Sequence, residues 1–282
     1  PIRHGSSVFT RKRSCRGCGP NSVEGMTLPA PLTITPLPGL PLVAPGTDLG
    51  TLLIAALEAA ALPLRSGDVL VVAQKIVSKA EGRYVDLATV EPSARARALG
   101  IETDKDPRLV EVILSESRAV VRHRPGVLIV EHRLGHVMAN AGVDRSNVAP
   151  EAGTEPVLLL PRDPDASAAA LRGQLMKRFD AEVAVIINDS FGRAWRNGTV
   201  GVALGAAGLP ALLDLRGRPD LYGRTLRVSE TGFADESAAA ASLVMGQADE
   251  AAPAVLVRGL QWSGAALPAT ALLRPAAQDL FR

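Results

Sequence analysis

The sequence predicts an α+β protein in which helices pack in layers on mixed sheets. Segments with the pattern of buried strands alternate with segments whose apolar residues recur at helical spacing, which is typical of layered folds. The 282 residues include 47% hydrophobic residues, enough to build a sizeable core. Aromatic residues make up only 3%, so we expect small aliphatic side chains to fill this core.

The first residues of the chain differ in composition from the rest. Residues 1–26 carry five basic residues and one acidic residue, in a chain whose net charge is +2. They contain neither the apolar stretch of a secretory signal nor an apolar periodicity. We therefore expect residues 1–29 to be a disordered or artefactual tail and residues 30–282 to be one domain. Because the excess basic charge belongs to this tail, we predict no nucleic-acid partner.

Both cysteines, Cys15 and Cys18, lie in the tail. With only His4 close enough in sequence to add a third ligand, this single CxxC pair does not predict a structural zinc site. Residues 27–282 contain no cysteine, which fits the cytoplasmic location that we predict. The uncharged run at residues 197–213 is shorter than a bilayer span and is interrupted by glycines, so we expect no membrane partner.

The predicted elements begin after residue 26. Four prolines between residues 36 and 45 predict an extended segment without a helix. Leucines and alanines at helical spacing predict a helix over residues 49–60, capped by Thr47 or Asp48. The run that starts at residue 69, VLVVA, is typical of a strand buried on both faces, and the chain turns polar at Gln74.

Further elements follow with the same alternation. Helices are predicted over residues 93–99, 107–115, 167–179 and 236–245, and strands over residues 119–122, 127–131, 136–139, 183–187, 225–229 and 254–257. A glycine-rich segment at residues 198–213 separates the strand at 183–187 from the last third of the chain.

Two acids follow predicted strands or turns. Asp189, with Ser190 beside it, stands at the carboxyl end of the strand predicted over residues 183–187, where open α/β sheets present ligands. This carboxylate is either a metal ligand or a helix cap. Asp144 and Asn147 follow the turn Asn140-Ala141-Gly142, where they either bind metal or form an Asx-turn in a surface loop.

Basic side chains also lie near predicted strand ends. Lys75, Lys79, Arg193 and Arg196 either hold phosphates or are solvated surface charges. Neither a P-loop nor a strand-linked GxGxxG sequence occurs, so a nucleotide would bind without the common fingerprints. The absence of a GxSxG elbow and of HExxH spacing disfavours hydrolases of those types. His132 and His136 are four residues apart, but the surrounding pattern is strand and turn, which does not favour a ligand pair.

Six blocks of sequence together resemble the coenzyme F420-0:L-glutamate ligase (F420-0:γ-glutamyl ligase) family. They are "PLPGLPLVAPGTDL", "GDVLVVAQKIVSKAEGR", "ETDKDPRLVEVILSES", "NAGVDRSNV", "INDSFGRAWRNGTVGVALGAAGLPAL" and "SETGFADESAAAASLVMGQADEAAPAVLVRG". The resemblance covers nearly all of residues 31–282 and implies the two-lobed fold of that family. It also implies the stand-alone form, without the nitroreductase-like domain of some actinobacterial members.

The resemblance further implies an activity. Members of the family use GTP to add L-glutamate, through a γ-linked tail, to coenzyme F420-0 in coenzyme F420 biosynthesis, with GDP as a product and an acyl phosphate as the intermediate. Two Mg²⁺ or Mn²⁺ ions per subunit are implied as cofactors, a K⁺ site is left open, and a homodimer is expected. Two other classes remain alternatives: a metal-dependent phosphotransferase or nucleotide hydrolase, and a non-catalytic protein that binds a deazaflavin or a nucleotide.

Site residues follow from matching the family's motifs to this sequence and from the chemistry of phosphate transfer. The metal ligands implied are Asp144, Asp189, Ser190 and Gln247; the nucleotide contacts are Leu40, Pro41, Leu42, Val43, Gln74, Lys79 and Asn147; and Lys79, Arg193 and Arg196 are expected to hold phosphate or substrate carboxylates during catalysis.

Overall fold

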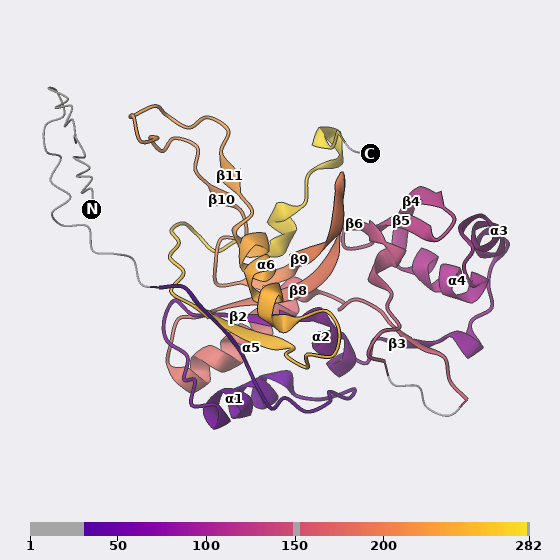
Figure 1. The fold of residues 1–282 in the computed structure, drawn as a ribbon, viewed down its shortest axis with the longest axis horizontal. Coiled ribbons are helices and arrows are strands. Elements are labelled where there is room, and N and C mark those ends of the chain that lie inside the picture. Colours follow the sequence, from indigo (N-terminus) through magenta and orange to yellow (C-terminus); the bar gives the residue numbers. More distant parts are fainter. Residues whose placement is uncertain (1–30, 149–152, 281–282) are drawn as a thin grey trace, which may run out of the picture. The chain divides into compact units, whose positions relative to one another are not determined.

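The computed structural model describes residues 31–148 and 153–280, which fall in one compact unit that spans residues 31–282 (Figure 1). The predicted tail, with both cysteines, and its boundary with the domain lie outside the described residues. Within the described part of the chain, no helix is both long and apolar enough to cross a membrane.

A five-stranded mixed sheet forms the centre of the fold. Its order is β1 (Thr33–Pro36), β12 (Ala254–Arg258), β2 (Val69–Ala73), β8 (Ala184–Arg193) and β9 (Arg196–Ala207). β2 and β8 run parallel, and all the other neighbours are antiparallel. The VLVVA segment is buried throughout β2 up to its last residue, as expected for a strand covered on both faces.

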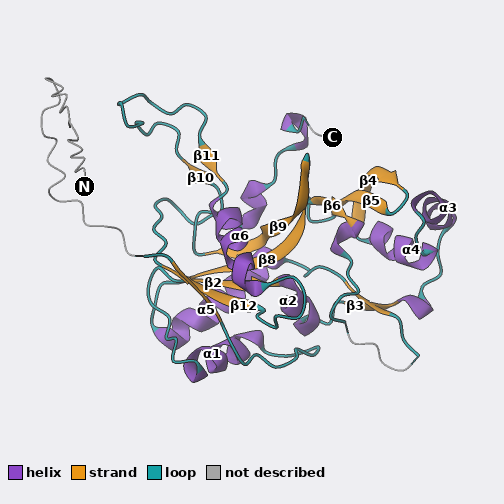
Figure 2. Ribbon diagram, viewed as in Figure 1, coloured by secondary structure: helices purple, strands orange, loops and turns teal. Residues whose placement is uncertain are grey.

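Helices cover both faces of this sheet (Figure 2). Alternate side chains of β2 and β8 enter two different apolar clusters, because successive residues of a strand point to opposite faces. One cluster includes leucines of α1 (Leu49–Ala59) and α5 (Pro164–Phe179). The other includes alanines of α6 (Phe233–Met245). Asp48 accepts a hydrogen bond from the backbone N–H of Thr51 and so caps α1 as predicted.

A second, smaller group of elements has its own apolar core. It comprises α3 (Ala94–Thr103), α4 (Pro107–Ser115) and a sheet of β4 (Ser117–Arg124), β5 (Val127–His132) and β6 (Val137–Ala139). The layered α+β fold class is therefore confirmed.

An ion cluster centred on Glu116 ties the two groups together. The Glu116 carboxylate accepts hydrogen bonds from Arg83 (2.9 Å) and Arg133 (2.8 Å), and the His132 Nε2 atom lies 3.4 Å away. Arg83 also donates to the backbone oxygen of Leu160 at 2.9 Å. Burial alone would raise the pKa of Glu116, but the neighbouring His132 side chain, the hydrogen bond from Arg133 and the charges of the two arginines lower it to about 2.

Several element predictions are corrected by the structure. Residues 225–229 do not form a strand, because this segment makes only an isolated bridge between Thr225 and Pro219 and leaves Val228 85% exposed. Short strands β10 (Leu213–Asp214) and β11 (Glu230–Thr231) pair instead. The helix α2 (Gln74–Ala80) and the paired strands β3 (Tyr84–Asp86) and β7 (Pro156–Leu158) were not predicted.

The largest correction concerns β8. It does not end near residue 187 but continues to Arg193, and β9 pairs with it along almost its whole length. The glycine-rich segment is therefore largely the antiparallel partner strand. A tight turn at Trp195, whose φ is 65°, joins the two strands. Asp189 and Ser190 consequently lie within a strand and do not cap a helix.

Candidate functional site

A pocket of about 560 Å³ lies at the carboxyl end of β2. Its walls come from the loop at residues 40–43, from α2, from residues 188–190 of β8 and from residues 245–253 after α6. β2 and β8 are parallel, and Ala73 pairs with Asn188. The polar residues that follow both positions therefore reach the same edge of the sheet, which is where open α/β sheets bind ligands.

Asp144 is held rigidly beside this pocket. Its backbone N–H and C=O both bond to Leu158, at 3.0 and 2.8 Å. Its carboxylate lies 2.8 Å from the Lys75 ammonium and accepts a hydrogen bond of 2.7 Å from the backbone N–H of Ser146. Burial opposes ionisation of Asp144, but the hydrogen bonds from Lys75 and Ser146 outweigh it and lower the pKa. Asp144 is therefore ionised at neutral pH.

Asp189 experiences a different environment. The carboxylate accepts a hydrogen bond of 2.8 Å from the backbone N–H of Ser190 and is partly exposed to the pocket. Burial raises its pKa to about 6, and the negative charge of Asp144 adds to this rise. Lys75 and Gln74 offset only part of the effect. The ionised carboxylate of Asp189 thus lacks full compensation within the protein.

Other predicted residues meet at the mouth of the pocket. Lys79 donates a hydrogen bond of 2.7 Å to the backbone oxygen of Asn147, whose φ of 56° places it in the left-handed region. The Asn147 side chain donates to the backbone oxygen of Ala248 at 3.3 Å. Ser190 donates to the side-chain oxygen of Gln247 at 2.6 Å. These bonds link α2, β8 and the segment after α6 around one cavity.

Most of the predicted site residues therefore lie together. The pocket is lined by Leu40, Pro41, Leu42, Val43, Gln74, Lys79, Asn147, Asp189, Ser190 and Gln247, and Asp144 joins it through Lys75. Arg193 and Arg196 do not line it, since the extension of β8 carries them to the exposed turn of the β8–β9 hairpin. There Arg193 donates to the backbone oxygen of Asn197 at 3.3 Å.

Comparison with known proteins adds to this geometry. The model of the F420-0:γ-glutamyl ligase family matches residues 39–259. The chain belongs to this family. It is 47% identical over 249 residues to the coenzyme F420:L-glutamate ligase of Methanothermobacter thermautotrophicus, with 86% of this chain and 96% of the relative covered. The corresponding ligase of Methanopyrus kandleri is also 47% identical, over 89% of this chain and 98% of the relative. The coenzyme F420:L-glutamate ligase of Methanocaldococcus jannaschii is 40% identical, over 78% of this chain and 86% of the relative.

The structure of this F420-0:γ-glutamyl ligase family member also shows site residues that the sequence prediction missed. Asn188 is 4% exposed, its amide donates to Ser242 at 3.1 Å, and its oxygen has no hydrogen-bond partner in the described part of the protein. Residues 248–253 form much of one wall. The glycine and proline that flank this segment, Gly246 and Pro253, are the sequence signal that a loop connects α6 to β12 there.

The donor atoms of the site fit a hard divalent cation. In the described residues no three His, Cys, Asp or Glu side chains converge as a metal-binding group. The candidate set instead combines the carboxylates of Asp144 and Asp189 with the hydroxyl of Ser190 and the amide oxygen of Gln247. All four donors are oxygens, the ligand type that Mg²⁺ and Mn²⁺ prefer, and Mg²⁺ usually keeps several waters as its other ligands.

Proposed function

We propose that this protein joins L-glutamate to a coenzyme F420 precursor in a GTP-dependent reaction. The main support is that relatives named coenzyme F420:L-glutamate ligase match it at 40–47% identity over most of both chains. The structure adds a pocket in which two acids and two lysines converge at one sheet edge.

The reaction needs an activated carboxylate, because a free carboxylate does not acylate an amine. The γ-phosphoryl group of GTP is transferred to a carboxylate oxygen of the acceptor, and GDP leaves. The glutamate amine then attacks the acyl carbon, the bond from this carbon to the phosphate oxygen breaks, and phosphate and one proton are released. Closure of the pocket against water would protect the acyl phosphate from hydrolysis.

The pocket offers suitable groups for a purine nucleotide. The loop at Leu40 to Val43 gives an apolar wall on which a base can lie. Lys75 and Lys79 supply positive charge for phosphates. Burial and the neighbouring charge of Lys75 lower the pKa of Lys79, so bound phosphates would favour its protonated form.

Asp144 and Asp189, with Ser190 and Gln247, would hold Mg²⁺ or Mn²⁺. A bound divalent ion would neutralise phosphate charge during transfer. The protein's own contribution is to fix Asp144 through its backbone pairing with Leu158 and to present Asp189 from the middle of a strand, so that few degrees of freedom are lost on binding.

The decisive experiment is mass spectrometry of the deazaflavin after incubation with GTP, L-glutamate and Mn²⁺. The expected product is heavier by one glutamyl residue, and GDP and phosphate appear only when glutamate is present. Nucleotide turnover without glutamate and without a mass gain would instead indicate a phosphotransferase or hydrolase. Binding of nucleotide or deazaflavin without any turnover would indicate a binding protein.

A further inference from the structure

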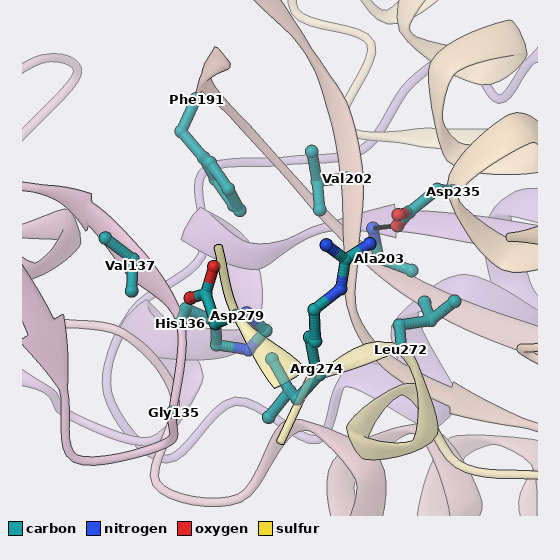
Figure 3. Close-up of a pocket in the computed structure, with 11 residues that line it drawn as sticks. Gly135, His136, Val137, Phe191, Val202, Ala203, Asp235, Leu272, Arg274 and Asp279 are labelled. Carbon is teal, nitrogen blue, oxygen red and sulfur yellow. Dashed lines mark hydrogen bonds between the residues drawn. The ribbon is translucent and has the colours of Figure 1, made fainter. Parts of the chain in front are cut away.

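A second cavity, of about 220 Å³, is lined in part by residues of β8 and β9 that lie close to Asp189. It is enclosed by the turn before β6, by the β8–β9 hairpin, by α6 and by the segment at residues 272–279. Its polar lining consists of His136, Asp235, Arg274 and Asp279, and its apolar lining includes Phe191 and Val202 (Figure 3).

This cavity adjoins the proposed catalytic pocket. Val202 is the direct cross-strand partner of Asp189, and the Cβ atoms of such partners lie about 5 Å apart on the same face. Phe191 follows Asp189 by two residues, so it faces the same side about 7 Å along the strand. A ligand in the cavity would therefore lie within reach of groups bound at Asp189.

The lining carries both signs of charge. Figure 3 shows Arg274 and Asp279 reaching the cavity from the C-terminal segment, whereas Asp235 comes from α6. One oxygen of Asp235 accepts a hydrogen bond of 2.9 Å from the backbone N–H of Ala203. No other hydrogen bond to this carboxylate is formed by the residues that the structure describes, which leaves its second oxygen as an acceptor.

His136 gives a second, independent sign of a ligand site. Its side chain is 7% exposed and contacts the ring of Phe191 edge-on, with 6.2 Å between the ring centroids. Its ring makes no hydrogen bond to another residue in the described ranges, although buried polar groups normally have a partner. Burial, with the nearby His132, lowers the pKa of His136 to about 4. The ring is therefore neutral at pH 7 and does not repel a cation.

We infer that this cavity binds the amino-acid substrate, L-glutamate, with a carboxylate held by Arg274 and the ammonium group held by Asp235 or Asp279. The inference rests on the proposed ligase function. A small cavity with one cationic and two acidic side chains can hold one carboxylate and the ammonium group of an amino acid, and its volume is below the roughly 300 Å³ at which sites for drug-sized ligands begin. Arg274 and Asp279 follow the residues 39–259 matched by the family model, so the assignment comes from this structure.

The test measures substrate dependence in the Arg274→Gln variant. We expect the KM for L-glutamate to rise at least about tenfold, because a charge-assisted hydrogen bond is lost. The KM values for GTP and for the deazaflavin should change less than twofold. Arg274→Lys should recover part of the effect. Arg218→Gln is the matched control, because Arg218 is an exposed arginine that lines neither cavity.

Direct binding of L-glutamate, measured by calorimetry on the same variants, separates this inference from the proposed function. Ligase activity with an unchanged glutamate KM in Arg274→Gln would overturn the cavity assignment and leave the function intact. A raised KM for the deazaflavin alone would also overturn it, since the cavity would then serve the acceptor. If the unmodified protein forms no product but binds L-glutamate, and Arg274→Gln abolishes that binding, the site stands and the ligase function fails.

Discussion

Replacing Asp189 by asparagine should separate activity from stability, because the carboxylate that we propose as a metal ligand is unfavourable in the folded protein. Asparagine keeps the side-chain oxygen that accepts the hydrogen bond from Ser190. It removes the charge that is repelled by Asp144. We therefore expect Asp189→Asn to lose at least about 100-fold in turnover, and to be more stable than the unmodified protein when metal is chelated.

The size of the stability gain follows from the pKa. Burial raises the pKa of Asp189 from 3.8 to about 6, and at about 1.4 kcal/mol per pKa unit this amounts to about 3 kcal/mol. Partial exposure to solvent makes this an upper value. Below pH 3.8 the carboxyl is protonated in both states, so the substitution has little effect. As pH rises to about 6 the unfolded state ionises first, the unmodified protein loses stability, and the advantage of the variant reaches its full size.

Urea unfolding in EDTA between about pH 4 and 8 measures this difference. The free energies of unfolding of the two proteins should converge at the acid end and diverge above about pH 6. Mn²⁺ should then raise the melting temperature of the unmodified protein but not that of Asp189→Asn. A variant that is less stable at pH 7.5 in EDTA, or one that turns over normally at limiting Mn²⁺, would show that the account of Asp189 is wrong.

Three further predictions concern the fold and assembly. Glu116→Gln should lower the free energy of unfolding by up to about 3 kcal/mol at pH 7, because the pKa of Glu116 is about 2 and the ordinary value is 4.5. The stability that the ionised carboxylate gives is lost as pH falls from 4.5 toward 2. Equal acid sensitivity of the two proteins in urea unfolding would contradict this. Gly205→Ala should lower the free energy of unfolding by about 1–3 kcal/mol and so lower the melting temperature, because the added Cβ atom would lie 2.2 Å from the backbone oxygen of Pro164. Gly192→Ala is the control, because the added Cβ atom there would meet open space. Light scattering should report a homodimer, and a monomer at micromolar concentration would reject that prediction.

The sequence predicted the elements whose apolar period is long and clear. The sequences of α1, α5 and α6 show capping residues or apolar residues at helical spacing. The VLVVA strand is apolar at every position, which predicts burial on both faces. The short paired strands β3 and β7 were missed because three residues carry no period. α2 was missed because it starts directly after β2 without a side-chain cap, so nothing local marks the change from strand to helix.

The candidate site was predicted better than the path of the chain through it. The residues implied by the family resemblance line one pocket, except Asp144, which contacts it through Lys75. The two arginines, which were expected from the chemistry of phosphate transfer, do not line it. Arg193 and Arg196 were misplaced because the polar residues after Ile187 suggested the end of a strand. Residues 188–193 instead continue the strand, because their backbone pairs with β9. This part of the hairpin extends beyond the core, so its side chains can be polar. The cavity beside Val202 could not be predicted, because it joins residues 135–137 to residues 272–279.

Lys75 leads to a final prediction about how the site accepts a cation. Its ammonium lies 2.8 Å from Asp144 and 2.5 Å from the hydroxyl of Ser146, so it compensates the carboxylate that a divalent ion would use. Lysine and metal should then compete for Asp144. We expect Lys75→Met to be destabilised by up to about 1 kcal/mol in EDTA, as is usual for a partly exposed ion pair. The same variant should bind Mn²⁺ more tightly, because the metal no longer displaces an ammonium group.

Melting temperatures across a Mn²⁺ titration measure both effects in one experiment. The curve for Lys75→Met should start lower and rise at lower Mn²⁺ concentrations than that of the unmodified protein. Turnover should still fall, since the displaced lysine would otherwise be available to a phosphate of GTP. If Mn²⁺ binds more weakly to Lys75→Met, the lysine supports the metal site instead of competing with it. In that case Asp144 and Lys75 would act together as a preformed anchor for the nucleotide.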